Sequence, residues 1–278
     1  MHVTRCSVPV ATRAPSGDTN AYLLREPTSS SPDDDRRESG TDPAVLVDPA
    51  ARTADLDRLV AEHTIEHMLV THTHPDHVGA VDEYATETDA TVWARYGRTD
   101  RFRDATGCEP DRTFAPRTTL SLGDERVRVL DAPGHAPDHI ALEAGRGGPV
   151  LCGDVAVREG SVVVGAPEGD MRAYVTTLRR LWARNPPALY PGHGPAIDAP
   201  RETLERLLAH RADREQRVCE AVRGGAETLD EILDAAYDKE LSGVRDLARA
   251  TVRAHLEKLA VEGRVAWDGD RATPPTVD

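Results

Sequence analysis

The sequence has little lysine, few aromatic side chains and no long apolar run. Lys239 and Lys258 are the only lysines, and the four cysteines are scattered without a Cys-x-x-Cys pair. No stretch of about eighteen uninterrupted apolar residues is present, so we expect no transmembrane helix. The first residues lack the apolar core of a signal peptide. Together these absences predict a reduced, cytoplasmic protein without a disulfide framework.

Positive charge is also scarce. The 278 residues carry 34 basic and 48 acidic side chains, a formal charge of −14 at pH 7. This excess of negative charge disfavours non-specific binding to nucleic acid or to an anionic membrane surface. An acidic, lysine-poor, arginine-retaining composition is typical of a halophile with a salty cytosol. A high-GC genome that encodes an acidic protein is the alternative explanation.

What is present is an alternation of short apolar strands with amphipathic helices, which predicts a layered α/β fold. At this length the chain can hold one large domain and a small one, and we place the boundary between residues 1–220 and 221–278. Between the second and third predicted strands, residues 25–43 are acidic and polar with little to bury. We therefore expect a flexible acidic loop there.

Four candidate metal ligands follow the apolar strand predicted at residues 65–70. His72 and His74 are two residues apart in extended backbone, so both imidazoles point to one side. Asp76 and His77 lie where a helix is expected to begin, after a proline suited to the first helical position. Imidazole and carboxylate groups suit zinc or iron(II). The pattern predicts two ligand pairs facing a common space, against the plainer alternative of a polar turn.

The spacing of these four residues resembles the His-x-His-x-Asp-His motif of the metallo-β-lactamase superfamily. Later strand ends match further motifs of the superfamily, and each delivers a candidate ligand; these are His135, Asp154 and His193. The resemblance implies an αββα sandwich with two divalent metal ions, with zinc expected first and iron or manganese as alternatives. It assigns one metal to His72, His74 and His135, and the other to Asp76, His77 and His193, with Asp154 bridging them.

The resemblance also implies roles for neighbouring side chains. Asp76 is the catalytic candidate, as a base in mononuclear members and as a ligand that orients the hydroxide here. Asp48 ends a strand and is expected either to hold the metal-site loops or to cap the next helix. Cys152 is interpreted as a small core residue rather than a ligand. For His139 two interpretations stay open: it supports the ligands from behind, or it lies at the surface.

The C-terminal part resembles superfamily members with an appended winged helix. Thr228 and Glu231 predict a capping box at a helix start, a longer helix is expected from Arg245 to Glu262, and residues 263–271 have hairpin character. Arg245, Arg249 and Arg253 fall on one helix face and could contact phosphates. However, residues 221–278 carry eight basic and twelve acidic side chains. Packing against the catalytic domain, a dimer interface or one wall of the substrate groove is therefore the favoured role.

The long helix between these parts contains His210, Arg211 and Arg214. We interpret the three as an ion-paired helix face, with substrate contact as the alternative.

These observations predict a cytoplasmic metallohydrolase that uses a hydroxide generated at the metal. The expected substrate is a small ester or thioester such as a hydroxyacyl-thiol, in the manner of glyoxalase-II-like enzymes and thioesterases. The alternative is a single-stranded RNA endonuclease with the same two-metal site, since the resembling branch includes such an enzyme. A metal-responsive regulator is the non-enzymatic alternative. A homodimer is compatible with these features, and no membrane partner is expected.

Overall fold

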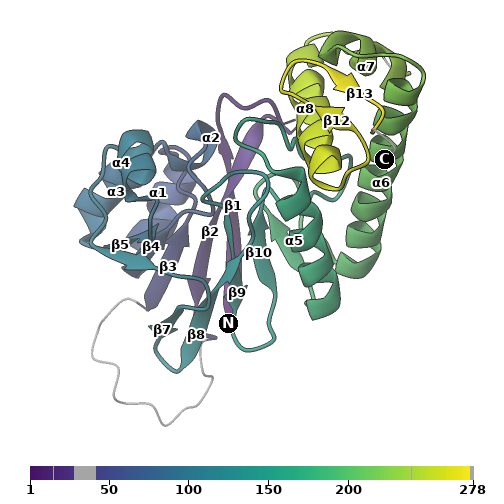
Figure 1. Ribbon diagram of the computed structural model, residues 1–278. Helices are drawn as coiled ribbons and strands as arrows, with labels where there is room; N and C mark the ends of the chain where they lie inside the picture. Colours follow the sequence, from purple (N-terminus) through teal and green to yellow (C-terminus); the bar gives the residue numbers. More distant parts are fainter. Residues whose placement is uncertain (15, 28–41, 239, 276–278) are drawn as a thin grey trace. The chain divides into compact units, whose positions relative to one another are not determined.

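The computed structural model describes residues 1–14, 16–27, 42–238 and 240–275, which form two compact units (Figure 1). Unit 1 comprises Met1–Asp131, Asp138–Arg158 and Pro186–Ala199. Unit 2 comprises Ala132–Pro137, Glu159–Asn185 and Pro200–Asp278. Residues 28–41 of the predicted acidic loop lie outside the described residues, so the expectation of flexibility there stays a prediction.

Unit 1 contains a six-stranded sheet in the order β1-β2-β3-β4-β5-β6. Its strands are β1 (His2–Pro9), β2 (Asp18–Arg25), β3 (Pro43–Val47), β4 (Thr64–Leu69), β5 (Thr91–Arg95) and β6 (Arg112–Phe114). The first three strands pair antiparallel, and β3 to β6 pair parallel. Because β3 and β4 run in the same direction, the residues that follow them meet at one edge of the sheet.

The second sheet of unit 1 has five strands in the order β11-β10-β9-β8-β7. These are β7 (Thr119–Leu122), β8 (Glu125–Asp131), β9 (Ile140–Ala144), β10 (Val150–Gly153) and β11 (Leu189–Pro191). β10 and β11 are parallel, while the other neighbours are antiparallel. The hairpin predicted over residues 120–130 is confirmed as β7 and β8. The two parallel ends bring Asp154 and His193 to the same edge.

Apolar side chains hold three layers of unit 1 together. One core joins the facing surfaces of the two sheets and includes Leu24, Val45, Leu69, Val129 and Leu142. A second core lies between the six-stranded sheet and its helices, which cover the sheet's other face (Figure 1). These helices are α1 (Ala54–Ala61), α3 (Val81–Thr88) and α4 (Thr99–Thr106), with the short α2 (Pro75–Val78) at the ligand motif. The predicted mixed α/β class is confirmed.

Unit 2 is built from helices with one small hairpin. Its elements are α5 (Met171–Arg184), α6 (Pro200–Arg223), α7 (Leu229–Ala236), α8 (Arg245–Val261), β12 (Ala266–Trp267) and β13 (Ala272–Thr273). α7 begins with the predicted capping box, because Thr228 accepts from the backbone of Glu231 and Glu231 accepts from the backbone of Thr228. A core of side chains from α6, α7, α8 and the hairpin holds this part together. The predicted boundary between residues 220 and 221 stays a prediction.

Within the residues that the structure describes, no helix is both long and apolar enough to cross a membrane.

Candidate metal centre

The first two histidines of the motif lie in the loop that follows β4. His72 is fully buried, and its Nε2 lies 3.0 Å from Nδ1 of His74. The two rings meet edge to face with centroids 4.6 Å apart. The structure therefore places both imidazoles on the same side of the loop, as the two-residue spacing predicts.

Asp48 and Thr71 orient the imidazoles of His72 and His77. The fully buried Asp48 carboxylate accepts from Thr71 N (2.6 Å), from Thr71 Oγ1 (2.7 Å) and from His77 Nδ1 (3.1 Å). Because the Thr71 hydroxyl donates to Asp48, its oxygen accepts from Nδ1 of His72 at 3.1 Å. In each ring Nδ1 then carries the proton, and the Nε2 lone pair is left for another partner. The role of Asp48 in holding the loops is confirmed, while α1 is capped by Thr53.

His139 supports Asp154 from behind. The backbone N–H of Asp154 donates to Nε2 of His139 at 2.9 Å, and the fully buried His139 ring stacks on His72 with centroids 4.9 Å apart. Gly153 allows this approach, since a Cβ there would lie 2.7 Å from His139 Nε2, and its φ of +47° is left-handed. Of the two alternatives for His139, the structure bears out the supporting role.

His193 follows β11 and is oriented by the start of β2. Its Nδ1 donates to the Asp18 carbonyl at 2.8 Å, so its Nε2 faces Asp154 Oδ2 at 3.5 Å and Asp76 Oδ2 at 3.6 Å. Gly192 leaves the space between these groups open, because a Cβ there would lie 2.4 Å from Asp154 Oδ1 and 2.7 Å from His77 Cε1. Any other residue at this position would fill the centre of the cluster.

Asp76 is held by the loop between β1 and β2. Thr12 Oγ1 donates to Asp76 Oδ2 at 2.6 Å, and the Asp76 side chain is 19% exposed. This exposure differs from that of His77, whose side chain is fully buried. Asp76 therefore lies at the solvent-accessible edge of the cluster.

His135 belongs to unit 2 and follows Pro133 and Gly134. Its Nδ1 donates to the Val163 carbonyl at 2.7 Å, which again leaves the lone pair on Nε2. The other six predicted ligands belong to unit 1. The place of His135 in the ligand set stays a prediction from its motif.

Negative charge near the buried imidazoles raises their pKa. Burial lowers the pKa of His193, but the hydrogen bond and charge of Asp154, with smaller contributions from Asp18 and Asp76, outweigh it and raise the pKa to about 9. Burial also opposes protonation of His77, but Asp48, Asp154 and Asp76 raise its pKa above the ordinary value. The carboxylates of this cluster favour a positive charge in its centre.

The side chains fit a divalent cation. Two overlapping triads bring ligand atoms within 4.8 Å of one another; they are His72, His77 and Asp154, and Asp76, His77 and His193. His77 Nε2 is buried, has no hydrogen-bond partner among the described residues, and faces Asp154 Oδ1 at 3.7 Å. An unpaired buried nitrogen beside a carboxylate is costly unless both share a cation. The donor set of imidazoles and carboxylates suits zinc, iron or manganese.

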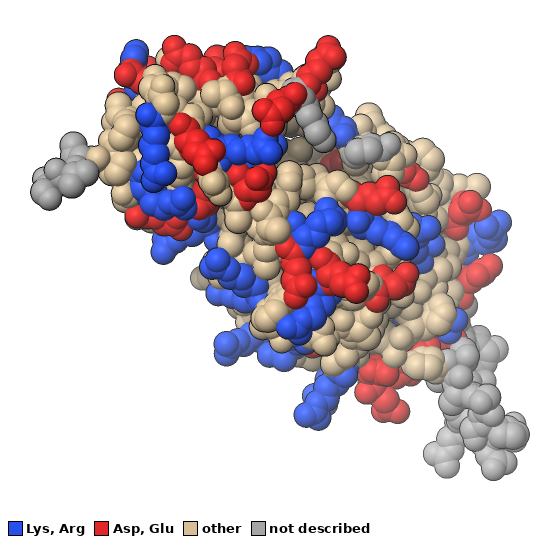
Figure 2. Space-filling view, turned by 90° about the vertical axis from the view of Figure 1, so that its right-hand side faces the viewer, with Lys and Arg blue, Asp and Glu red and all other residues tan. Residues whose placement is uncertain are grey.

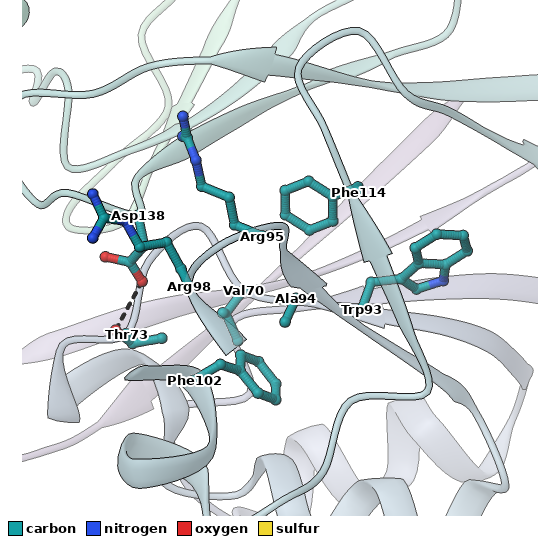
Figure 3. Close-up of a pocket in the computed structure, with 9 residues that line it drawn as sticks. All are labelled: Val70, Thr73, Trp93, Ala94, Arg95, Arg98, Phe102, Phe114 and Asp138. Atoms are coloured by element: carbon teal, nitrogen blue, oxygen red, sulfur yellow. Dashed lines mark hydrogen bonds between the residues drawn. The ribbon is translucent and has the colours of Figure 1, made fainter. Parts of the chain in front are cut away.

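A shallow hollow borders the ligand loop but contains none of the seven predicted ligands (Figure 3). Trp93, Phe102 and Phe114 contribute aromatic rings to its lining. Thr73 reaches it from between the two histidines, donating to Asp138 at 2.8 Å and accepting from Arg101 Nε at 2.8 Å. The hydrogen bonds of Thr73 thus fix the ligand loop on the side of this hollow, and the hollow itself is not assigned as the reaction site.

Several of these supporting residues were not predicted from the sequence. Thr12, Asp18 and Thr71 are ordinary polar residues whose roles depend on contacts with distant parts of the sequence. Only Thr71 could have been suspected from the sequence, because it is adjacent to His72. Cys152 is a fully buried core residue, as predicted, and burial raises the pKa of its thiol to about 12. Arg211 differs from the expected ion-paired face: it is buried and donates to the Val162 carbonyl at 2.5 Å.

Comparison with known proteins explains this arrangement. The family profile of the metallo-beta-lactamase superfamily matches residues 17–193, which contain all seven predicted ligands. The chain belongs to this superfamily. A second profile, the beta-lactamase associated winged helix domain, matches residues 228–273 and confirms the predicted C-terminal winged helix. As a metallo-beta-lactamase-fold protein with metallohydrolase relatives, the chain is an enzyme of the hydrolase class, and its fold implies divalent metal ions.

Individual relatives resemble the chain over most of its length. Beta-lactamase-like protein 2 homolog of Drosophila melanogaster is 30% identical over 212 residues, covering 73% of this chain and 70% of that protein. Probable metallo-hydrolase YqjP of Bacillus subtilis is 25% identical over 291 residues, covering 82% and 89%. Thioesterase pkgB of Emericella nidulans is 26% identical over 166 residues, covering 58% and 44%.

A solved structure supports the fold of both the catalytic and the C-terminal parts. A metallo-beta-lactamase family protein from Thermus thermophilus superposes with a TM-score of 0.75 at 23% identity, covering 98% of each chain.

Proposed function

We propose that this protein hydrolyses small thioesters or esters, such as a hydroxyacyl-thiol, with two divalent metal ions for which zinc is the first candidate. The observation that carries the proposal is the Nε2 of His77, which is buried beside Asp154 and has no hydrogen-bond partner in the part of the chain that the structure describes. His77 is the residue that the two triads of candidate ligands share, and Asp154 belongs to one of them. A hydrolase that needs a strong electrophile and a low-pKa water has a use for such a site.

The seven predicted ligands are assigned as the motifs suggest. His72, His74 and His135 would hold one metal, Asp76, His77 and His193 would hold the other, and Asp154 would serve both. When bound, such ions lower the pKa of water from about 15.7 to about 7 and polarise the scissile carbonyl. Asp48 and the Asp18 carbonyl fix the tautomers of His77 and His193, so that both present Nε2. Such supporting bonds orient metal ligands in many proteins.

Asp76 has a second role toward the attacking water. Its Oδ2 is engaged by the Thr12 hydroxyl at 2.6 Å, which fixes the plane of the carboxylate. We assign Oδ1 to accept a hydrogen bond from the water and so to direct its lone pair toward the substrate carbonyl. Its partly exposed position suits contact with a water that exchanges with solvent.

Two observations support a thioester over RNA. The relative from Emericella nidulans carries the name thioesterase. In the winged helix, the arginines of α8 are already paired: Arg245 with Asp234 at 2.7 Å, Arg249 with Asp230 at 3.5 Å, and Arg253 with Glu257 at 2.9 Å. On the face shown in Figure 2, basic side chains alternate with acidic ones, so positive charge is not gathered there for a phosphate backbone.

The test is a substrate panel on purified, metal-loaded protein at low and high salt. It contains S-lactoylglutathione, acyl-CoA thioesters, a penam or cephem, and a labelled single-stranded RNA. We expect thioester turnover that is lost on chelation, restored by zinc, and reduced at least about a hundredfold in Asp76→Ala. The matched control is Asp89→Asn, an exposed carboxylate at the end of α3, which should leave turnover unchanged.

Two results would reject the proposal. Cleavage of RNA that depends on Asp76, without thioester turnover, would replace the substrate class with the endonuclease alternative. Turnover that survives both chelation and His72→Ala would reject the metal-dependent reaction itself.

A further inference from the structure

The loop that carries His135 is fixed directly by α5 and its N-cap residue, Asp170. The Asp170 N–H donates to the Gly134 carbonyl at 2.8 Å, and Thr177 Oγ1 donates to the Pro133 carbonyl at 2.8 Å. A Cβ on Gly134 would lie 2.4 Å from the backbone of Tyr174, so loop and helix are in close contact. These bonds hold the backbone of the loop but not the imidazole of His135.

The imidazole is instead held by residues 160–166, which we name the strap. Val163 accepts from His135 Nδ1 at 2.7 Å, and the neighbouring carbonyl of Val162 accepts from Arg211 Nη2 at 2.5 Å. Because the two carbonyls belong to consecutive residues, a movement at Val162 displaces the acceptor of His135. The strap has no assigned helix or strand of its own to resist such a movement.

Arg211 is suited to hold this strap. Its side chain comes from α6, is 4% exposed, and lies over the ring of the fully buried Tyr174 at 5.2 Å. A buried guanidinium held over an aromatic ring has few orientations open to it, so its donors point in fixed directions. The buried position also makes its hydrogen bond to a carbonyl stronger than an exposed one.

The winged helix contacts the other end of the strap. The Ala166 N–H donates to the Ala250 carbonyl on α8 at 3.1 Å, and a Cβ on Gly165 would lie 2.8 Å from the Ala250 side chain. The strap is therefore clamped by α6 at Val162 and by α8 at Ala166. This gives the C-terminal domain a function that does not depend on binding nucleic acid.

We infer that Arg211 is a positioning residue for His135, acting through the Val162–Val163 peptide of a strap that the winged helix secures at Ala166. The inference rests on the proposed ligand role of His135. Arg211 fixes which way the Nε2 lone pair of His135 points, and so the affinity of the metal that His135 is proposed to hold.

The test compares metal affinities of Arg211→Met and Arg214→Met by competition with a chromophoric chelator, using Zn²⁺ and Co²⁺. Arg214 is a matched control: it lies on the same helix, over the Tyr237 ring at 3.5 Å, and it donates to the Ala236 carbonyl, away from the strap. We expect Arg211→Met to weaken one of the two metals about tenfold, as loss of a supporting bond commonly does. Arg214→Met should leave both affinities unchanged.

A double variant separates positioning from general destabilisation. His135→Ala should weaken the same metal, and adding Arg211→Met to it should cause no further loss, because the effect of Arg211 passes through His135. If the Met variant does not fold, Arg211→Lys replaces it, since lysine keeps a donor but lacks the planar guanidinium and should weaken the same metal by a smaller factor.

The outcomes are distinguishable. Wild-type protein that binds no metal rejects the proposed function. Wild-type protein that binds two metals, with unchanged affinities in Arg211→Met or Arg211→Lys, overturns the inference alone. An equal loss from Arg211→Met with and without His135 also overturns it, because Arg211 would then act on the fold and not on that imidazole.

Discussion

At the residue scale, Asp48 joins the loop after β4 to the imidazole of His77. It adopts φ +52°, a left-handed conformation that few residues other than glycine accept, and Asp is among those that tolerate it. This backbone turns a fully buried carboxylate back toward Thr71 and His77. The strain is offset by three hydrogen bonds to one ionised group.

Asp48→Asn tests this role with little change of volume. The amide keeps one acceptor but directs an NH₂ group at a donor, so we expect about 2–4 kcal/mol lower stability and about 10–100-fold weaker binding of the metal near His77. Urea unfolding and chelator competition measure the two effects. Asp89→Asn is the control, since Asp89 is left-handed at φ +54° but exposed. Wild-type metal affinity in Asp48→Asn would contradict the prediction.

Gly192→Ala tests whether the centre needs open space. The new Cβ would lie 2.4 Å from Asp154 Oδ1 and 2.7 Å from His77 Cε1. We therefore expect the affinity for metal to fall at least about tenfold. In the control Gly194→Ala the added Cβ meets nothing within 4 Å, although φ is +77°. That variant should lose about 1 kcal/mol of stability and keep its metal. Elemental analysis after dialysis would decide, and equal metal content in the two variants would refute the prediction.

At the scale of elements, the ends of parallel strands bring the ligands together. β3 and β4 deliver Asp48 and His72 to one edge, and β10 and β11 deliver Asp154 and His193. Such an arrangement is predictable because each motif is local: an apolar strand followed by a polar turn. The roles of Thr12, Asp18 and Arg211 were missed because each is set by packing between segments far apart in sequence. In the sequence Arg211 resembles any other arginine on a charged helix, and only the structure shows its hydrogen bond to the strap.

The capping box at the start of α7 was predicted from the sequence, and its contribution to stability can be measured. Thr228→Ala removes the side chain that accepts from Glu231 N, which leaves a helix N–H without its cap. We expect a loss of about 1 kcal/mol in the stability of unit 2, measured by urea unfolding followed by circular dichroism. Thr228→Ser keeps the acceptor and should lose little. No difference between the two variants would show that the cap is not stabilising.

At the scale of the whole molecule, unit 2 keeps two histidines neutral. Burial, then the charges of Arg211, Lys258, Arg214 and His210, lowers the pKa of His255 well below its ordinary value of 6.5. Burial, then Arg211 and Arg214, lowers the pKa of His210 to about 4, with Asp213 opposing. Both ring nitrogens of His255 are buried without a hydrogen-bond partner among the described residues. These groups make stability depend on pH.

The direction of this dependence follows from proton binding. Below pH 6.5 the unfolded chain protonates these histidines while the folded chain does not, so the unfolded state binds more protons. The free energy of unfolding therefore falls as pH decreases from 6.5, and the contribution of His210 levels off below about 4. Urea unfolding between pH 7.5 and 4.5 measures the slope. His255→Leu should flatten it, and an unchanged slope in this variant would contradict the assignment.

Lys258 is one of two lysines in the chain and lies inside α8, where its Nζ donates to Glu215 at 2.5 Å and to Glu262 at 2.9 Å. A protease specific for lysine can cut there only after α8 opens locally, because a helical backbone does not fit an extended protease cleft. The rate of cleavage at this bond thus reports how often the winged helix opens. Since α8 also holds Ala166 of the strap, metal binding should slow that cleavage.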